Sequence, residues 1–162
     1  MDNTKTNQLD FKLIDALAIG EDWAEDADIN NPIHVVEIYI DGVEIVEIFR
    51  RVEIPYCEQE GHPDMAGSYG HESPKQLYRD LINAPKESSL TYEMGVHPVC
   101  CRSCGMSCCW AVTFHVREDE SFVWWYQFEH EHRDWEYNLE FKFTKTDYAA
   151  AMEKLLLWKD QK

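Results

Sequence analysis

Two runs of alternating apolar side chains, separated by a charged segment, constrain the fold of this chain more than any other feature. The runs cover residues 110–116 and 122–128, with the charged segment 117–121 between them. Successive side chains of a strand point to opposite faces of a sheet, so this pattern predicts two strands joined by a turn. One face of the second run consists of Phe122, Trp124, Tyr126 and Phe128. Its other face is also apolar, which indicates a central strand, and 139–143 is predicted as a third.

A second hairpin is predicted in the amino-terminal half. Residues 33–49 are rich in β-branched side chains, and Asp41 and Gly42 form a two-residue turn because both positions tolerate a positive φ. The alternation slips near Val46, which we interpret as a bulge or as a sheet covered on both sides. Residues 55–73 show no hydrophobic period and are predicted to form a long loop.

Helical patterns occupy three segments. Residues 9–19 are predicted as a short amphipathic helix, 74–83 as a helix capped by Ser73, and 145–158 as a helix capped by Thr144. The inward face of the last helix is predicted to consist of Tyr148, Met152, Leu155 and Leu156. The fold class is therefore α+β: an antiparallel sheet made of the hairpin and the carboxy-terminal meander, with two or three helices packed on it.

The size and composition of the chain predict one folded domain over residues 1–162, with 1–30 as a loosely packed amino-terminal segment. A chain of 162 residues that is 44% hydrophobic and 13% aromatic can bury a substantial core. The amino terminus lacks the basic and apolar regions of a signal peptide, and no apolar run is long enough to span a bilayer. We therefore expect a cytoplasmic protein without a membrane partner, in a compartment that keeps thiols reduced.

The charge balance constrains the partners. Thirty-one acidic residues against fifteen basic ones give a net charge of −16. This charge opposes binding to the phosphates of nucleic acids, and it steers a basic protein toward the chain. The other interpretation is that the acidity only keeps the protein in solution.

Five of the six cysteines lie within residues 100–109. Cys101 and Cys104 have the C-x2-C spacing that presents two sulfurs to one zinc ion, and Cys109 and His97 complete the predicted Zn²⁺ site. We prefer Cys109 to its neighbour because it lies off the apolar face of the strand that follows. The alternative ligands are Cys57, His62, His71 and Cys108. Three interpretations stay open: a metal site, a local disulfide or redox pair, and packed free thiols.

No catalytic residue and no cofactor-binding residue is predicted. The sequence lacks the motifs of nucleotide-binding loops, zinc proteases and serine hydrolases. Cysteine catalysis needs a stabilised thiolate, which an acidic protein disfavours. His130 and His132 would point the same way on an extended chain and suit a transition metal, but no third ligand is fixed by spacing, so a solvated loop is the favoured interpretation.

One set of residues in the sequence forms a recognisable pattern: Cys104-Gly105-Met106-Ser107-Cys108-Cys109-Trp110, Val123-Trp124, Phe128, Phe141, Phe143, Tyr148 and the turn Ala66-Gly67-Ser68-Tyr69. On these residues, the carboxy-terminal half resembles a bacterial protein family with a CGxxGCW signature and no established activity. The resemblance covers residues 60–157, and Cys108 stands where the family has glycine. It implies a small α+β domain and singles out Cys104 and Cys109, but it supplies no activity.

The sequence thus leads to two hypotheses about function. The first is a non-enzymatic binding protein for a basic protein partner, comparable to the bacterial immunity proteins that bind toxins. The alternative is a small zinc-binding protein with a structural, redox or metal-sensing role.

Overall fold

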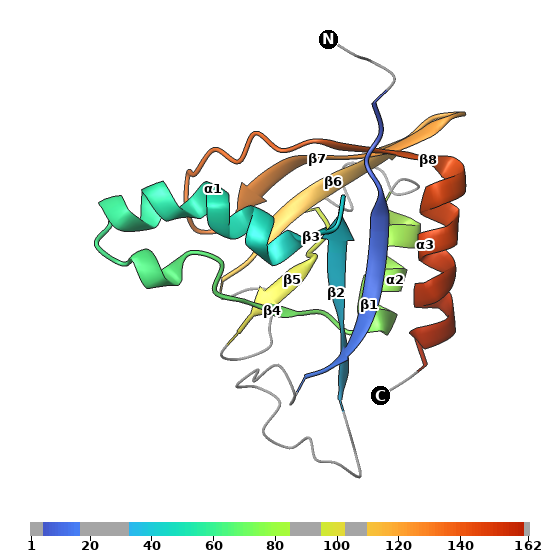
Figure 1. Cartoon of the computed structure of the whole chain (residues 1–162), viewed down its shortest axis with the longest axis horizontal. Coiled ribbons are helices and arrows are strands. Elements are labelled where there is room, and N and C mark those ends of the chain that lie inside the picture. The colour runs from blue at the N-terminus through green and yellow to red at the C-terminus, as the bar shows by residue number, and fades with distance from the viewer. Residues whose placement is uncertain (1–4, 17–32, 85–94, 103–109, 161–162) are drawn as a thin grey trace.

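The computed structural model describes residues 5–16, 33–84, 95–102 and 110–160 (Figure 1). The elements are β1 (Leu9–Asp15), β2 (His34–Ile40), β3 (Val43–Glu44), α1 (Ile45–Gln59), the 3₁₀ turn η2 (Pro63–Met65), β4 (Tyr69–His71), α2 (Pro74–Asn83), β5 (Val99–Cys101), β6 (Val112–Glu118), β7 (Phe122–His130), β8 (Phe141–Thr144) and α3 (Lys145–Trp158). All strand pairs are antiparallel, and the predicted α+β class is confirmed. Among the described residues, no helix has both the length and the apolar character needed to cross a membrane.

The strands form three sheets, in the orders β1-β2-β3, β4-β5 and β6-β7-β8. Single backbone hydrogen bonds join these sheets at their edges. Val36 N donates to Glu72 O at 2.9 Å, Val96 N donates to Phe114 O at 2.7 Å, and Asn7 N donates to Lys142 O at 2.7 Å. Because each contact links a different pair of sheets, the three sheets form one closed circuit of strands.

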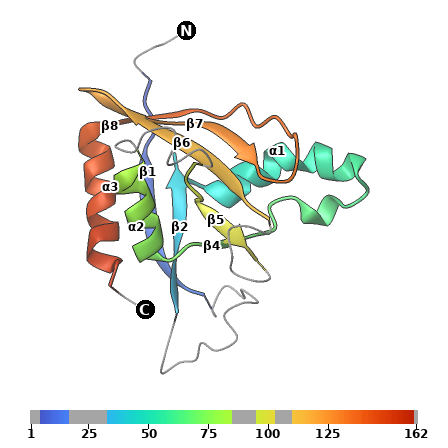
Figure 2. The ribbon, with the colours of Figure 1, turned by 180° about the vertical axis from the view of Figure 1, so that it is seen from behind.

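Helices α2 and α3 lie side by side and cover one face of β1 and β2 (Figures 1 and 2). The strands turn a row of buried apolar side chains toward these helices. That row consists of Leu9, Phe11, Val36, Ile38 and Ile40. Leu77 and Leu81 of α2 and Leu155 of α3 complete this part of the core. The helices therefore bury the apolar face of the strands, and the strands bury the apolar faces of the helices.

The carboxy-terminal meander has β7 as its central strand, as predicted. Its register with β6 shifts near the end of the strand, where Gln127 adopts a positive φ of 57° and forms a bulge. The extra residue turns Phe128 to the buried face that holds Val123 and Trp125. The prediction that Phe128 shares a face with Trp124 was wrong for this reason.

The predicted helix at 9–19 was also wrong, because Leu9–Asp15 is strand β1. Leu9, Phe11 and Leu13 alternate with Asp10 and Lys12, which is a period of two, and Leu9 and Phe11 are buried. Seven residues of β1 pair with β2, and this long-range pairing outweighs the local helical preference. Residues 17–19 of the predicted segment lie outside the described residues.

The turn at Asp41 and Gly42 is confirmed, with φ values of 52° and 82°. The second arm of this hairpin is only Val43–Glu44, however, and helix α1 occupies most of the remaining predicted strand and the start of the predicted loop. The expected bulge near Val46 is therefore the first turn of a helix. Its buried stripe repeats every four residues, and it consists of Ile45, Phe49, Glu53 and Cys57.

Helices α2 and α3 are confirmed with the predicted bounds and caps. Ser73 Oγ accepts a hydrogen bond from Gln76 N at 3.2 Å, and Thr144 Oγ1 accepts one from Asp147 N at 3.1 Å. On α3 the inward face includes Ala151, Met152 and Leu155, whereas Leu156 is 46% exposed. The prediction for Leu156 was therefore wrong.

Candidate functional site

The structure describes some of the predicted zinc ligands and not others. Cys104, Cys108 and Cys109 lie outside the described residues. Cys101 is half-buried at the end of β5, where it pairs with Tyr69 of β4. The predicted set of four therefore stays a prediction.

Among the described residues, the other predicted ligands form no group of three with a cysteine. His97 Nε2 lies 2.5 Å from Glu131 Oε1, so a carboxylate holds this ring. Cys57 is buried in α1, and burial raises the pKa of its thiol, while His62 is exposed beyond the end of that helix. Within the described parts of the chain, the single group of three possible ligand atoms within 4.8 Å contains His71, with two glutamates and no cysteine.

His130 is buried rather than solvated, so the favoured interpretation of this histidine was wrong. Its ring lies 4.2 Å from the ring of Trp110 and 5.0 Å from that of Trp135, measured between centroids. Its Nδ1 accepts a hydrogen bond from His132 N at 3.0 Å, and its Nε2 has no partner among the described residues. Burial, and then the charge of Arg133, lowers the pKa of His130 to about 4, so the ring is neutral.

This buried histidine predicts a loss of stability in acid. An unfolded histidine titrates near pH 6.5 and the folded one near a pKa of about 4, so the unfolded state binds more protons between these values. The free energy of unfolding should fall as the pH drops from 6.5 to 4. Urea denaturation across this range should show a shallower fall for His130→Gln than for the wild type. Equal slopes would contradict the assignment of a neutral buried ring.

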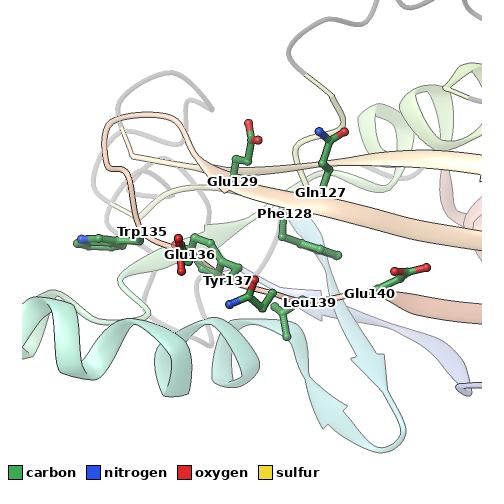
Figure 3. Close-up of a pocket in the computed structure, with 9 residues that line it drawn as sticks. Gln127, Phe128, Glu129, Trp135, Glu136, Tyr137, Leu139 and Glu140 are labelled. Carbon is green, nitrogen blue, oxygen red and sulfur yellow. The ribbon is translucent and has the colours of Figure 1, made fainter. Parts of the chain in front are cut away.

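A hollow of about 550 Å³ lies between the end of β7 and the returning segment 135–140 (Figure 3). It exists because β8 pairs only with Phe122–Trp125, which leaves the second half of β7 facing an irregular segment instead of a strand. We call this hollow the acidic groove. Its lining consists of Gln127, Phe128, Glu129, Trp135, Glu136, Tyr137, Asn138, Leu139 and Glu140.

The residues that line the acidic groove include three exposed glutamates and no basic residue. Among the described residues, Glu129, Glu136 and Glu140 have no ion-pair or side-chain hydrogen-bond partner. Figure 3 shows Phe128 on the side of β7 that faces the segment 135–140, whereas Glu129 extends from the opposite side of the strand. The groove thus has an acidic rim, with Glu136 and Glu140 on one wall and Glu129 at the edge of the other.

Two residues of the groove have a left-handed backbone. Gln127 and Asn138 have φ values of 57° and 51°, although neither is glycine. Such a conformation costs about 1 kcal/mol or more for a residue with a side chain, and proteins keep it mainly where it shapes a turn or a binding site. In Gln127 it creates the bulge, and in Asn138 it sets the course of the opposite wall.

Helix α1 holds the wall formed by 135–140. The ring of Trp135 stacks on Tyr56 with centroids 5.6 Å apart, and Trp135 Nε1 donates to Glu60 Oε2 at 3.2 Å. Further along, the hydroxyl of Tyr137 donates to the buried carboxyl of Glu53. Because ring stacking and buried hydrogen bonds fix this segment, the groove is a preformed feature of the fold.

No protein-family model matches the chain, and searches of the curated proteins and of the solved structures give no match either. The resemblance to the CGxxGCW family therefore stays a prediction. The sequence contains one indication of this acidic site: acidic residues recur from the end of β7 to the start of β8, at positions 129, 131, 134, 136 and 140.

Proposed function

We propose that this protein is a non-enzymatic binding protein whose acidic groove receives lysine or arginine side chains of a basic protein partner. The observation that carries the proposal is the set of three exposed glutamates around a groove without a cation in its lining, none of which has an ion-pair partner among the described residues. Immunity proteins that neutralise basic toxins would be the closest functional comparison.

The composition of the groove supports a cationic ligand with an apolar stem. Carboxylates attract an ammonium or guanidinium group, and the half-buried Leu139 offers apolar surface to the methylene chain behind it. The net charge of −16 adds long-range steering, which speeds the encounter with a basic protein at low salt.

The lining also favours binding over catalysis. Among the residues that line the groove, the possible bases and nucleophiles are three exposed glutamates, with no histidine, cysteine, serine or lysine beside them. The polar atoms of its aromatic residues are already engaged, since Tyr137 donates to Glu53 and Trp135 donates to Glu60.

The test compares two variants that have the same net charge of −13. The groove variant carries Glu129→Gln, Glu136→Gln and Glu140→Gln, and the control carries three substitutions at exposed sites outside the groove: Glu58→Gln, Glu120→Gln and Glu153→Gln. Calorimetric titration with a lysine-rich peptide, and with any basic protein recovered by pull-down from the native host, gives the affinities. We expect the groove variant to lose roughly tenfold in affinity, because exposed ion pairs contribute about 0.2–1 kcal/mol each.

The control should retain most of its affinity, since it changes only the long-range field. Equal losses in both variants would show that net charge alone drives binding and would contradict a role for the groove. Failure to recover a basic partner at either low or high salt would contradict the proposed function itself.

A further inference from the structure

A second group of acidic and imidazole side chains lies far from the groove along the chain. Glu37 of β2, Glu44 of β3 and His71 of β4 each place one ligand atom within 4.8 Å of the other two. These strands meet because β3 and β4 follow one another along the same edge of β2. The three residues therefore converge from three separate segments at the junction of two sheets.

The imidazole distinguishes this group from a solvated patch of acids. The side chain of His71 is only 10% exposed, and its Nε2 lies 2.6 Å from Glu44 Oε1. The side chain of Glu44 is 25% exposed, so water and ions can reach the group. A buried ring that is held by its surroundings keeps its nitrogen aimed at the carboxylates.

Tyr39 acts as an outer partner of the same group. Its hydroxyl donates to Glu37 Oε1 at 3.2 Å, which orients this carboxylate and leaves the second oxygen for another partner.

Two carboxylates meet one imidazole in this group. Lys12 lies opposite Glu37 in the strand pairing and places its Nζ 4.2 Å from the ring centroid of Tyr39. A divalent ion bound between His71 and Glu44 would bring a double positive charge to both carboxylates at once.

We propose that Glu37, Glu44 and His71 bind a divalent first-row transition-metal ion. Two carboxylate oxygens and one imidazole nitrogen form a donor set that suits manganese, iron or zinc. Bonds to such ions are about 2.0–2.2 Å long, so atoms already within 4.8 Å need only small side-chain rotations to share one ion. Three protein ligands leave coordination positions for water or for a small ligand.

Manganese is the sharper probe, because Mn²⁺ prefers oxygen and nitrogen donors and avoids the thiolates of the cysteine-rich segment. Protein freed of metal by a chelator is titrated with Mn²⁺, Zn²⁺ and Mg²⁺ by calorimetry, with thermal unfolding as a second readout. We expect one Mn²⁺ per chain and a rise of the Tm. The paired variant Glu37→Gln, Glu44→Gln should lose at least tenfold in Mn²⁺ affinity, in line with the roughly 10–100-fold losses known for perturbed metal sites.

The control variant Glu58→Gln, Glu120→Gln makes the same change in net charge at exposed positions and should retain the affinity. Circular dichroism shows whether each variant folds. If the paired variant does not fold, the single variant Glu37→Gln takes its place in the Mn²⁺ titration. His71→Gln should weaken Mn²⁺ binding more than Mg²⁺ binding, because imidazole is a poor ligand for magnesium. Absence of Mn²⁺ binding, equal losses in both paired variants, or equal losses of Mn²⁺ and Mg²⁺ in His71→Gln would each overturn the proposal.

Discussion

Replacement of Glu53 by alanine is expected to lower the free energy of unfolding by about 3–5 kcal/mol, because it removes a buried hydrogen-bond acceptor and side-chain volume together. Glu53 is 0% exposed. It accepts hydrogen bonds from the hydroxyl of Tyr69 at 2.5 Å, from the hydroxyl of Tyr137 and from Gly67 N at 2.9 Å. Alanine would leave two buried hydroxyls and the half-buried Gly67 N without this acceptor, and it would also leave a cavity.

The matched control is Glu58→Ala, an exposed position on the same helix, where the change should stay within about 0.5 kcal/mol. Chemical denaturation followed by circular dichroism measures both. A loss below about 1 kcal/mol for Glu53→Ala would contradict the buried network, because a single unpaired buried group already costs about that much.

The variant Glu53→Gln removes the carboxyl group's ability to carry a charge while it keeps the shape of the side chain. Glutamine keeps the volume and one acceptor oxygen, so the expected loss is only about 1–2 kcal/mol. Burial raises the pKa of the Glu53 carboxyl, so its folded state binds more protons than its unfolded state above the ordinary value of 4.5. The advantage of the wild type over Glu53→Gln should therefore be largest in acid and shrink as the pH rises through the folded pKa.

Replacement of Gly95 by alanine should cost about 2–4 kcal/mol, since it combines an unfavourable backbone conformation with a steric clash. Gly95 has a φ of 79°, and a Cβ built on it would lie 2.6 Å from the carbonyl oxygen of Phe114. The next residue, Val96, exchanges with Phe114 the hydrogen bonds that join β6 to its neighbouring segment. The clash would push apart a contact that closes the circuit of strands.

Gly42→Ala is the matched control, because Gly42 has a φ of 82° but no atom within 4 Å of the added Cβ. It should lose only the conformational part, about 1 kcal/mol. The difference in unfolding free energy between the two variants isolates the clash. Equal losses of unfolding free energy in the two variants would contradict a steric clash between the added Cβ at position 95 and the carbonyl oxygen of Phe114.

The sequence predicted those elements whose signals are local. Alternation located β6, β7 and β8, and cap residues placed α2 and α3, because a period and a cap act within a few residues. Helix α1 was missed since Pro55 lies inside it and a glutamate, Glu53, interrupts its apolar stripe. Strand β1 was missed because only pairing with β2 decides between its two possible periods.

Neither candidate site could be located from the sequence alone. The groove depends on how far β8 pairs along β7 and on the bulge at Gln127, and both are results of long-range packing. His71 was among the predicted alternative ligands, but its partners Glu37 and Glu44 come from other strands. The residue types alone indicate that a metal could bind, but only the pairing of the strands places the ligand atoms of these three residues within 4.8 Å of one another.

The half of β7 that β8 leaves unpaired also bears on how the molecule avoids self-association. A strand edge without a partner is a template for aggregation, and proteins protect such edges with charge. In the described part of the chain, the second half of β7 has one edge without a paired strand, and Glu129 lies on it while Glu136 and Glu140 face it. Two molecules approaching through this edge would bring six carboxylates together, so the groove that we propose for a basic partner also repels other copies of the protein.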